Sequence, residues 1–119
     1  MSERSERGRR GERAARRHLT RRGWTILAER WRGAGGELDI VAARGVVVIA
    51  CEVKTRTDAR ALIEPLTVAQ RERIARAAEA FVALHPGLAD RDLRLDLITV
   101  RPGRLRAHVD HLPGVVSLP

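Results

Sequence analysis

Gly36-Glu-Leu-Asp-Ile-Val-Ala42 and Val46-Val-Val-Ile-Ala-Cys-Glu-Val-Lys-Thr-Arg56 are the two stretches that decide how this chain folds. Both are rich in β-branched and aliphatic residues, which favour strands. Residues 43–45, Ala-Arg-Gly, are short enough to close a hairpin between them, and Gly45 can take the positive φ that such turns need. The sequence therefore predicts a pair of adjacent central strands.

These two predicted strands carry acids where a core strand is normally apolar. Side chains two apart on a strand share a face, so Glu52 and Lys54 point the same way, as do Glu37 and Asp39. The opposite face of the first strand is predicted to hold Leu38, Ile40 and Ala42. Pairing of the strands would gather three carboxylates and one ammonium.

The segment before these strands is typical of a basic helix. We expect a flexible arm over residues 1–7, then a helix to Arg22 whose buried stripe is Gly11, Ala15 and Leu19, ended by Gly23. Glu12 lies beside this stripe among arginines. It is either a surface ion-pair partner or a carboxylate turned toward the acids of the strands.

A short strand is predicted over residues 24–28, with Trp24, Ile26 and Ala28 on one face. Residues 33–36, Gly-Ala-Gly-Gly, are expected to form a loop that gives clearance near the acids. This loop enters a strand rather than a helix, so it is no phosphate-binding loop. Trp31 could stack on a base, but packing in the interior is the interpretation we favour.

Beyond residue 56 a polar loop is expected to cover one end of the sheet as far as residue 66. Thr67 and Gln70 fit a capping box at the start of a helix that runs to about Leu84. Strands follow at residues 93–100 and 105–112. The predicted order is αβββαββ, an α/β fold in which the second helix links two parallel strands of a mixed sheet flanked by helices.

Length and composition indicate one domain over residues 1–119 that is folded and intracellular in type. No apolar run approaches the roughly 20 residues that span a bilayer, so we expect a cytoplasmic protein without membrane association. Cys51, the only cysteine, lies inside an apolar strand. Neither a disulfide framework nor a thiolate zinc site is available, and Cys51 is interpreted as a small core residue.

The chain has a net charge of +8, which indicates a polyanionic partner because nucleic-acid binding depends largely on phosphate contacts. Composition alone leaves this open, since abundant Arg and Ala also follow from a GC-rich coding sequence. Lys54 is the only lysine among 23 basic residues and stands beside Glu52. A compact, titratable ammonium at this position differs chemically from a guanidinium.

Carboxylates without His or Cys partners suit Mg²⁺ or Mn²⁺, which take oxygen ligands and keep several waters. Such acids repel one another in a core unless a cation or Lys54 compensates them. A metal ion held there neutralises a phosphodiester, activates a water and stabilises the leaving oxygen. The pattern therefore indicates nuclease chemistry.

The two strand motifs resemble the Asp…(Asp/Glu)-x-Lys signature of the restriction-endonuclease-like nucleases. The whole chain resembles the UPF0102 family of YraN-like proteins, usually described as predicted endonucleases. The matching positions, which cover most of the chain, are Gly8, Gly11-Glu12, Ala15, Leu19, Gly23, Trp31-Arg32, Gly36 to Asp39, Glu52 to Arg56, and Arg94-Leu95-Asp96.

This resemblance implies a restriction-endonuclease-like fold and a metal site made by Asp39, Glu52 and the Val53 carbonyl. Lys54 would position the attacking water or stabilise charge. Glu12 and Glu37 would be additional acids, like those of Holliday-junction resolvases of similar fold. The arginines expected to contact nucleic acid are Arg13, Arg16, Arg17, Arg32 and Arg56.

One position departs from the family pattern: Gln70-Arg71 stands where members usually carry a Lys early in the second helix. Gln70 could act as the helix-borne Gln of some related nucleases, although a capping role already explains it. Asp96 matches the family without an assigned role, and a partner for a neighbouring Arg is an equally good interpretation.

Two functions are consistent with these observations. The first is an endonuclease dependent on Mg²⁺ or Mn²⁺ that cleaves DNA, including branched or structured DNA as resolvases do. The second is a nuclease-like module that binds nucleic acid or a protein without cutting. The joint presence of Asp39, Glu52 and Lys54 favours the enzyme. Nucleic acid, DNA in particular, is the expected partner, and a homodimer is left open.

Overall fold

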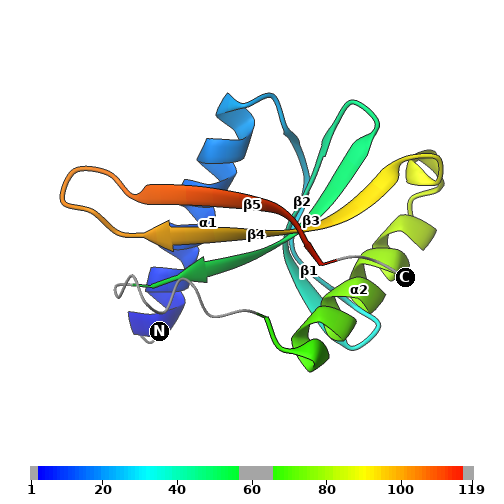
Figure 1. The fold of residues 1–119 in the computed structure, drawn as a ribbon, viewed down its shortest axis with the longest axis horizontal. Coiled ribbons are helices and arrows are strands. Elements are labelled where there is room, and N and C mark those ends of the chain that lie inside the picture. The colour runs from blue at the N-terminus through cyan, green and yellow to red at the C-terminus, as the bar shows by residue number, and fades with distance from the viewer. Residues whose placement is uncertain (1–2, 57–65, 117–119) are drawn as a thin grey trace.

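A five-stranded mixed sheet with a helix on each face forms the protein (Figure 1). It is seen in a computed structural model that describes residues 3–56 and 66–116. The order of the elements confirms the predicted αβββαββ architecture. Their bounds are α1 Glu3–Arg21, β1 Thr25–Gly33, β2 Gly36–Arg44, β3 Val47–Thr55, α2 Val68–Ala83, the short 3-10 helix η2 Pro86–Leu88, β4 Asp92–Arg101 and β5 His108–Val116.

The strands lie in the order β1-β2-β3-β4-β5, so neighbours in the sheet are also neighbours in the sequence. β3 and β4 pair in parallel, and the other three pairs are antiparallel. Parallel strands need a long crossover, which α2 provides between β3 and β4, as predicted. Gly45 closes the β2–β3 hairpin at φ +58°, although the turn is Gly45-Val46 rather than residues 43–45.

Each face of the sheet has its own apolar core. On the α2 face, Ile74, Ala77, Ala78 and Phe81 of the helix pack on the sheet; the buried strand residues there are Leu38, Val41, Val48, Ala50 and Leu95. On the α1 face, Ala15 and Leu19 pack on the other side; the buried strand residues there are Ile40, Ala42, Ile49, Cys51, Ile98 and Val100. The central strands are apolar on both faces because helices cover both.

Two predictions about strand faces are wrong. A bulge between Ile26 and Ala28 shifts the register of β1, so Ala28 packs on the α2 face while Ile26 stays on the α1 face. In β2, Leu38 packs on the α2 face and Ile40 on the α1 face, although they are two residues apart. The β2–β3 ladder ends at Ile40 and Cys51, and Arg30 of β1 takes φ +51° between the Glu29–Ile40 and Trp31–Leu38 pairs, so the strands are irregular at this point.

The elements also differ from the predicted bounds. α1 begins at Glu3, so most of the backbone expected to form a flexible arm is helical. β1 continues to Gly33, which places Trp31 in a strand, and the expected glycine loop is the two-residue turn Ala34-Gly35. The last strand is displaced to His108–Val116. It contains Pro113, which is tolerated because β5 is an edge strand. The polar loop predicted to end at residue 66 lies, for residues 57–65, outside the described residues.

Trp31 packs edge-on against Phe81, with ring centroids 5.4 Å apart, as expected for a Trp in the interior rather than a free base-stacking platform. Neither of the two described α-helices combines the length and the apolar character that a membrane span requires.

Candidate functional site

The site forms where the β2–β3 ladder ends. Beyond the Ile40–Cys51 pair, a carboxylate oxygen of Asp39 accepts a hydrogen bond from the backbone N–H of Val53 at 2.7 Å, in place of a ladder carbonyl. The N–H and C=O of one residue in an extended strand face the same neighbour. The Val53 carbonyl therefore lies on the side of β3 where Asp39 stands.

Asp39 and Glu52 come from adjacent strands and share a hydrogen bond between their carboxyl groups. Burial raises the pKa of Asp39 to about 6; the hydrogen bond from Val53 opposes this, and the charges of Glu12 and Glu37 add to it. Burial also raises the pKa of Glu52 to about 8, together with the charge and hydrogen bond of Asp39. Two acids this close hold one proton between them because both cannot ionise at little cost.

Lys54 is buried, with 8% of its surface exposed. The charge of its ammonium lowers the pKa of Glu52 and so opposes burial and Asp39, which raise it. The structure thus places Glu52 within electrostatic reach of both Asp39 and Lys54. An unusual buried Lys beside a pair of protonatable acids is a typical candidate for a functional group.

Glu12 reaches this cluster from α1. It accepts a hydrogen bond from Arg30 of β1 at 2.6 Å, and its charge raises the pKa of Asp39. Both interpretations of Glu12 therefore hold, since one carboxylate is an ion-pair partner and also faces the acids of the strands. Arg30 takes φ +51°, which is uncommon for a residue with a side chain. Arg30 could not be selected from local sequence signals, because its partner lies 18 residues away in the chain.

A pocket of about 660 Å³ opens beside the acids, between the β1–β2 turn and α2. Glu37 and Glu52 line one side, and Arg32, Arg73 and Gln70 line the rest with neighbouring glycines and Ile74. Asp39 and Lys54 are not part of its lining. Arg32 is 81% exposed and lies 3.4 Å from Glu37, so its guanidinium is free to turn toward a ligand.

Gly36 explains how α2 comes so close to this pocket. A Cβ at this position would stand 2.6 Å from the backbone carbonyl of Arg73, closer than real contacts allow. The glycine thus gives clearance, as expected, but chiefly for the helix. Arg73 was missed in the sequence; the available signal was its position three residues after Gln70, which places both on one side of the helix.

Gln70 forms the predicted capping box. Its side chain accepts from the Thr67 N–H at 2.8 Å, and the Thr67 hydroxyl accepts from the Gln70 N–H at 3.1 Å. The side-chain oxygen of Gln70 therefore caps the N-terminus of α2, while the residue also lines the pocket. The box fixes the first turn of α2 next to Glu52.

The acids offer a limited set of metal ligands. Among residues 3–56 and 66–116, no three His, Cys, Asp or Glu side chains are grouped so that they could hold a metal ion. A cation would depend on Asp39, Glu52 and the Val53 carbonyl, with water completing its coordination. This donor set fits Mg²⁺ or Mn²⁺, which take oxygen ligands; Mg²⁺ in particular uses one or two carboxylates and keeps several waters.

The arginines predicted to contact nucleic acid separate into groups. Arg32 lines the pocket beside the acids. Arg13 and Arg17 line a second pocket, between α1 and the segment that joins β4 to β5. Arg16 instead extends toward Glu29 of β1, at 3.8 Å. Arg56 follows β3, two residues after Lys54, and donates to the Thr55 carbonyl at 3.0 Å.

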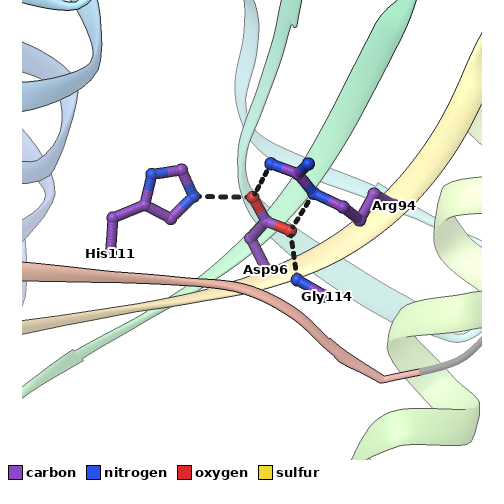
Figure 2. Close-up of polar contacts among 4 residues, drawn as sticks. All are labelled: Arg94, Asp96, His111 and Gly114. Carbon is purple, nitrogen blue, oxygen red and sulfur yellow. Dashed lines mark hydrogen bonds and ion pairs between the residues drawn. The ribbon is translucent and has the colours of Figure 1, made fainter.

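Asp96 belongs to a separate network, shown in Figure 2. Its fully buried carboxylate accepts two hydrogen bonds from Arg94, one from His111 at 2.6 Å and one from the Gly114 N–H at 2.9 Å. Burial alone would raise the pKa of Asp96, but the hydrogen bonds from His111, Arg94 and Gly114 outweigh it and lower that pKa. These hydrogen bonds connect β5 to β4. The interpretation of Asp96 as the partner of a neighbouring Arg is therefore confirmed, with Arg94 as that partner.

Comparison with known proteins gives one family. Residues 11–100 match the model of a family described as "Uncharacterised protein family UPF0102". A UPF0102 protein of Synechococcus sp. is 40% identical, over 93% of this chain and 91% of the relative. One of Streptomyces coelicolor is 42% identical over 97% and 92%, and one of Paramagnetospirillum magneticum is 46% identical over 76% and 74%.

Proposed function

The chain belongs to the uncharacterised protein family UPF0102, and we propose that it is a metal-dependent endonuclease that hydrolyses DNA. One observation carries the proposal: Asp39 and Glu52 share a hydrogen bond at the end of a buried hairpin, where both have raised pKa values. Holding two acids in contact costs stability, which a purely structural role does not explain.

A divalent cation relieves this cost because it replaces the shared proton as the compensating charge. When bound by Asp39, Glu52 and the Val53 carbonyl, Mg²⁺ or Mn²⁺ supplies charge neutralisation at the phosphodiester and a more acidic water. The residues of the chain then have distinct tasks. Lys54 holds a positive charge in a mostly buried position beside Glu52, where it can orient the water or stabilise the developing negative charge.

The pocket beside Glu52 is suited to the phosphate backbone. Arg32 stands at the β1–β2 turn and Arg73 on α2, so a phosphodiester in the pocket would meet a guanidinium on either side. Guanidinium groups match phosphate oxygens with two parallel hydrogen bonds. None of these contacts reads a base, so the proposed enzyme selects its substrate by backbone shape, which is consistent with structured or branched DNA.

A non-catalytic nucleic-acid-binding module is the alternative, and one observation favours it. Within the described part of the chain, no cluster of three metal-ligating side chains exists, so any metal affinity rests on two carboxylates and a carbonyl. The basic charge and the pocket arginines would serve such a module equally well.

Cleavage assays with four variants separate the two functions. With Mg²⁺ or Mn²⁺ present, we expect Asp39→Asn and Glu52→Gln to lower cleavage by about 100-fold or more, because each removes a metal ligand. Lys54→Ala should lose cleavage but keep metal binding, measured by calorimetry. Lys54→Arg keeps the charge and should bind DNA normally while cutting poorly, since its shape and hydration differ.

The substrates for this assay are linear, nicked and four-way-junction DNA. Arg76→Gln on the exposed side of α2 is a control for lost positive charge and should cleave like the wild type. If the wild type cleaves none of these substrates with either metal, and all variants bind DNA equally, the binding module is the correct assignment.

A further inference from the structure

A second basic surface lies on the opposite side of the sheet from the α2 pocket, between α1 and the residues that join β4 to β5. Two neighbouring pockets of about 510 and 380 Å³ share five lining residues, Ala14, Arg17, Leu105, Arg106 and Ala107, and together form one continuous groove. Figure 1 shows the hairpin of β4 and β5 crossing α1 on this side.

The charge of this groove has one sign. Its arginines are Arg10, Arg13, Arg17 and Arg21 from α1, Arg22 directly after the helix, and Arg106 from the opposite wall. Among the residues that the structure describes, no acid lines either pocket and none of these six arginines forms an ion pair. Arg16 on the same helix points away and pairs with Glu29. Within the described residues, the groove arginines of α1 thus have no ion-pair partner, while Arg16 is directed toward β1.

Apolar surface lies between these charges. Leu105 is 99% exposed, and Ala14, Ala107 and Pro102 are also part of the lining. A single nucleic-acid strand presents phosphates together with unpaired bases and sugars, which fit such a mixed surface. A duplex hides its base faces and leaves the apolar part of this surface without a partner. A lipid surface would require an exposed apolar helix face, but Ala15 and Leu19 of α1 are buried against the sheet.

One end of the groove lies beside the end of β3. Gly11 and Thr55 line one end of it, and their neighbours in the chain are Glu12 and Lys54. The groove arginines of α1 run from Arg10 to Arg21, about 16 Å of helix at 1.5 Å per residue, which is room for several nucleotides. A strand lying along α1 would therefore reach the end of β3, where the proposed site stands.

We infer that this groove binds a single-stranded segment of nucleic acid, which adjoins the bond to be cleaved. The link to cleavage rests on the proposed function, but binding of the strand does not. The substrate is then a DNA structure with an unpaired arm, such as a flap or a frayed branch, rather than continuous duplex.

Fluorescence anisotropy with a labelled thymidine oligonucleotide of about 20 nucleotides, longer than a typical single site, tests the groove in buffer with EDTA. We expect Arg17→Gln/Arg106→Gln to weaken binding about tenfold at low salt. The slope of log affinity against log salt should fall by about 0.7 for each arginine that contacts phosphate. Arg16→Gln/Arg76→Gln removes the same charge outside the groove and should bind within about twofold of the wild type.

Three results would overturn the inference. The two double variants could bind the strand with equal affinity, or the groove variant could lose as much affinity for blunt duplex as for the strand. The groove variant alone could also lose binding to phosphatidylserine vesicles while its strand binding is unchanged. Glu52→Gln should bind the strand normally. If the wild type binds the strand through the groove but cleaves no substrate, the proposed function fails while the groove assignment stands.

Discussion

At the scale of single residues, the acids Asp39 and Glu52 make stability depend on pH in an unusual direction. Their pKa values are raised in the folded protein, so the folded state binds more protons than the unfolded chain between about pH 4 and 8. The contribution of these two acids to stability is therefore most favourable below their unfolded pKa values and falls as the pH rises through the folded ones. Most proteins with ion-paired carboxylates behave in the opposite way.

We predict that Glu52→Gln stabilises the metal-free protein at pH 8 by about 2 to 4 kcal/mol, since one pKa unit corresponds to about 1.4 kcal/mol. At pH 4 the difference should nearly disappear. Urea unfolding in EDTA across this pH range measures it, with Glu79→Gln as a control for loss of an exposed carboxylate. Mn²⁺ should stabilise the wild type more at pH 8 than at pH 5. Parallel pH profiles of the wild type and Glu52→Gln would contradict the coupling.

Asp96 is a second acid whose environment has a measurable effect. Its pKa is lowered, so its contribution is present above the unfolded value near 3.8 and is lost as the pH falls through the folded value. We expect Asp96→Asn to cost about 3 kcal/mol at pH 7, because the charges of its buried partners lose their counter-charge. Asp110→Asn, on the same edge strand, removes an exposed acid 3.3 Å from His108 and should cost less than about 0.5 kcal/mol. Similar losses in both variants would rule out a special role for the buried carboxylate.

Much of this detail was accessible from residue spacing, and some was not. The two-residue period placed Glu52 and Lys54 together because β3 is regular there. It failed at Leu38, because the strands are irregular at Arg30, between the residues that pair with Ile40 and Leu38. The bond from the Val53 amide to Asp39 depends on where that ladder stops, and no local signal gives that position.

At the scale of elements, the close approach of α2 to the β1–β2 turn depends on one missing side chain. We predict that Gly36→Ala destabilises the protein by about 1 to 3 kcal/mol, because the new Cβ would collide with the Arg73 carbonyl, which belongs to the helix backbone and cannot rotate away. Thermal unfolding measures the loss.

Gly87→Ala is the matched control. Nothing lies within 4 Å of a Cβ at Gly87, so its effect should stay within about 0.5 kcal/mol. If Gly36→Ala is as stable as this control, α2 must be free to move outward, and the pocket would not be fixed by the packing that the structure shows.

The order and type of elements were predictable because hydrophobic periodicity and the capping box are local signals. The bounds of β1 and β5 were not. β1 extends through Arg32 because pairing with β2 overrides the polar composition of that segment. The bulge after Ile26 adds one residue to the strand, which changes the face of everything beyond it.

At the scale of the whole molecule, the fold places arginines that form ion pairs and arginines that line a groove on different surfaces. Composition indicated a polyanionic partner, but it could not separate arginines that pair within the protein from those directed into a groove. Arg16 and Arg17 are adjacent in the sequence and face different surroundings. Neighbouring residues of a helix point about 100° apart, which separates Arg16 from Arg17. Only the packing of α1 shows which of the two sides faces β1.

The β2–β3 hairpin has a further consequence for the way in which the chain reaches its native state. Its two strands are joined by the two-residue turn Gly45-Val46, whereas β3 and β4 meet only across the long connection that contains α2. Contacts between residues close in sequence form faster than distant ones, because less chain entropy is lost on closing the loop. Asp39 and Glu52 are therefore expected to come together early, before the helices cover the sheet. While water still surrounds the two carboxylates, their repulsion is weak. It grows when α1 and α2 pack on the sheet and exclude that water, so we expect the repulsion to oppose this late step of folding.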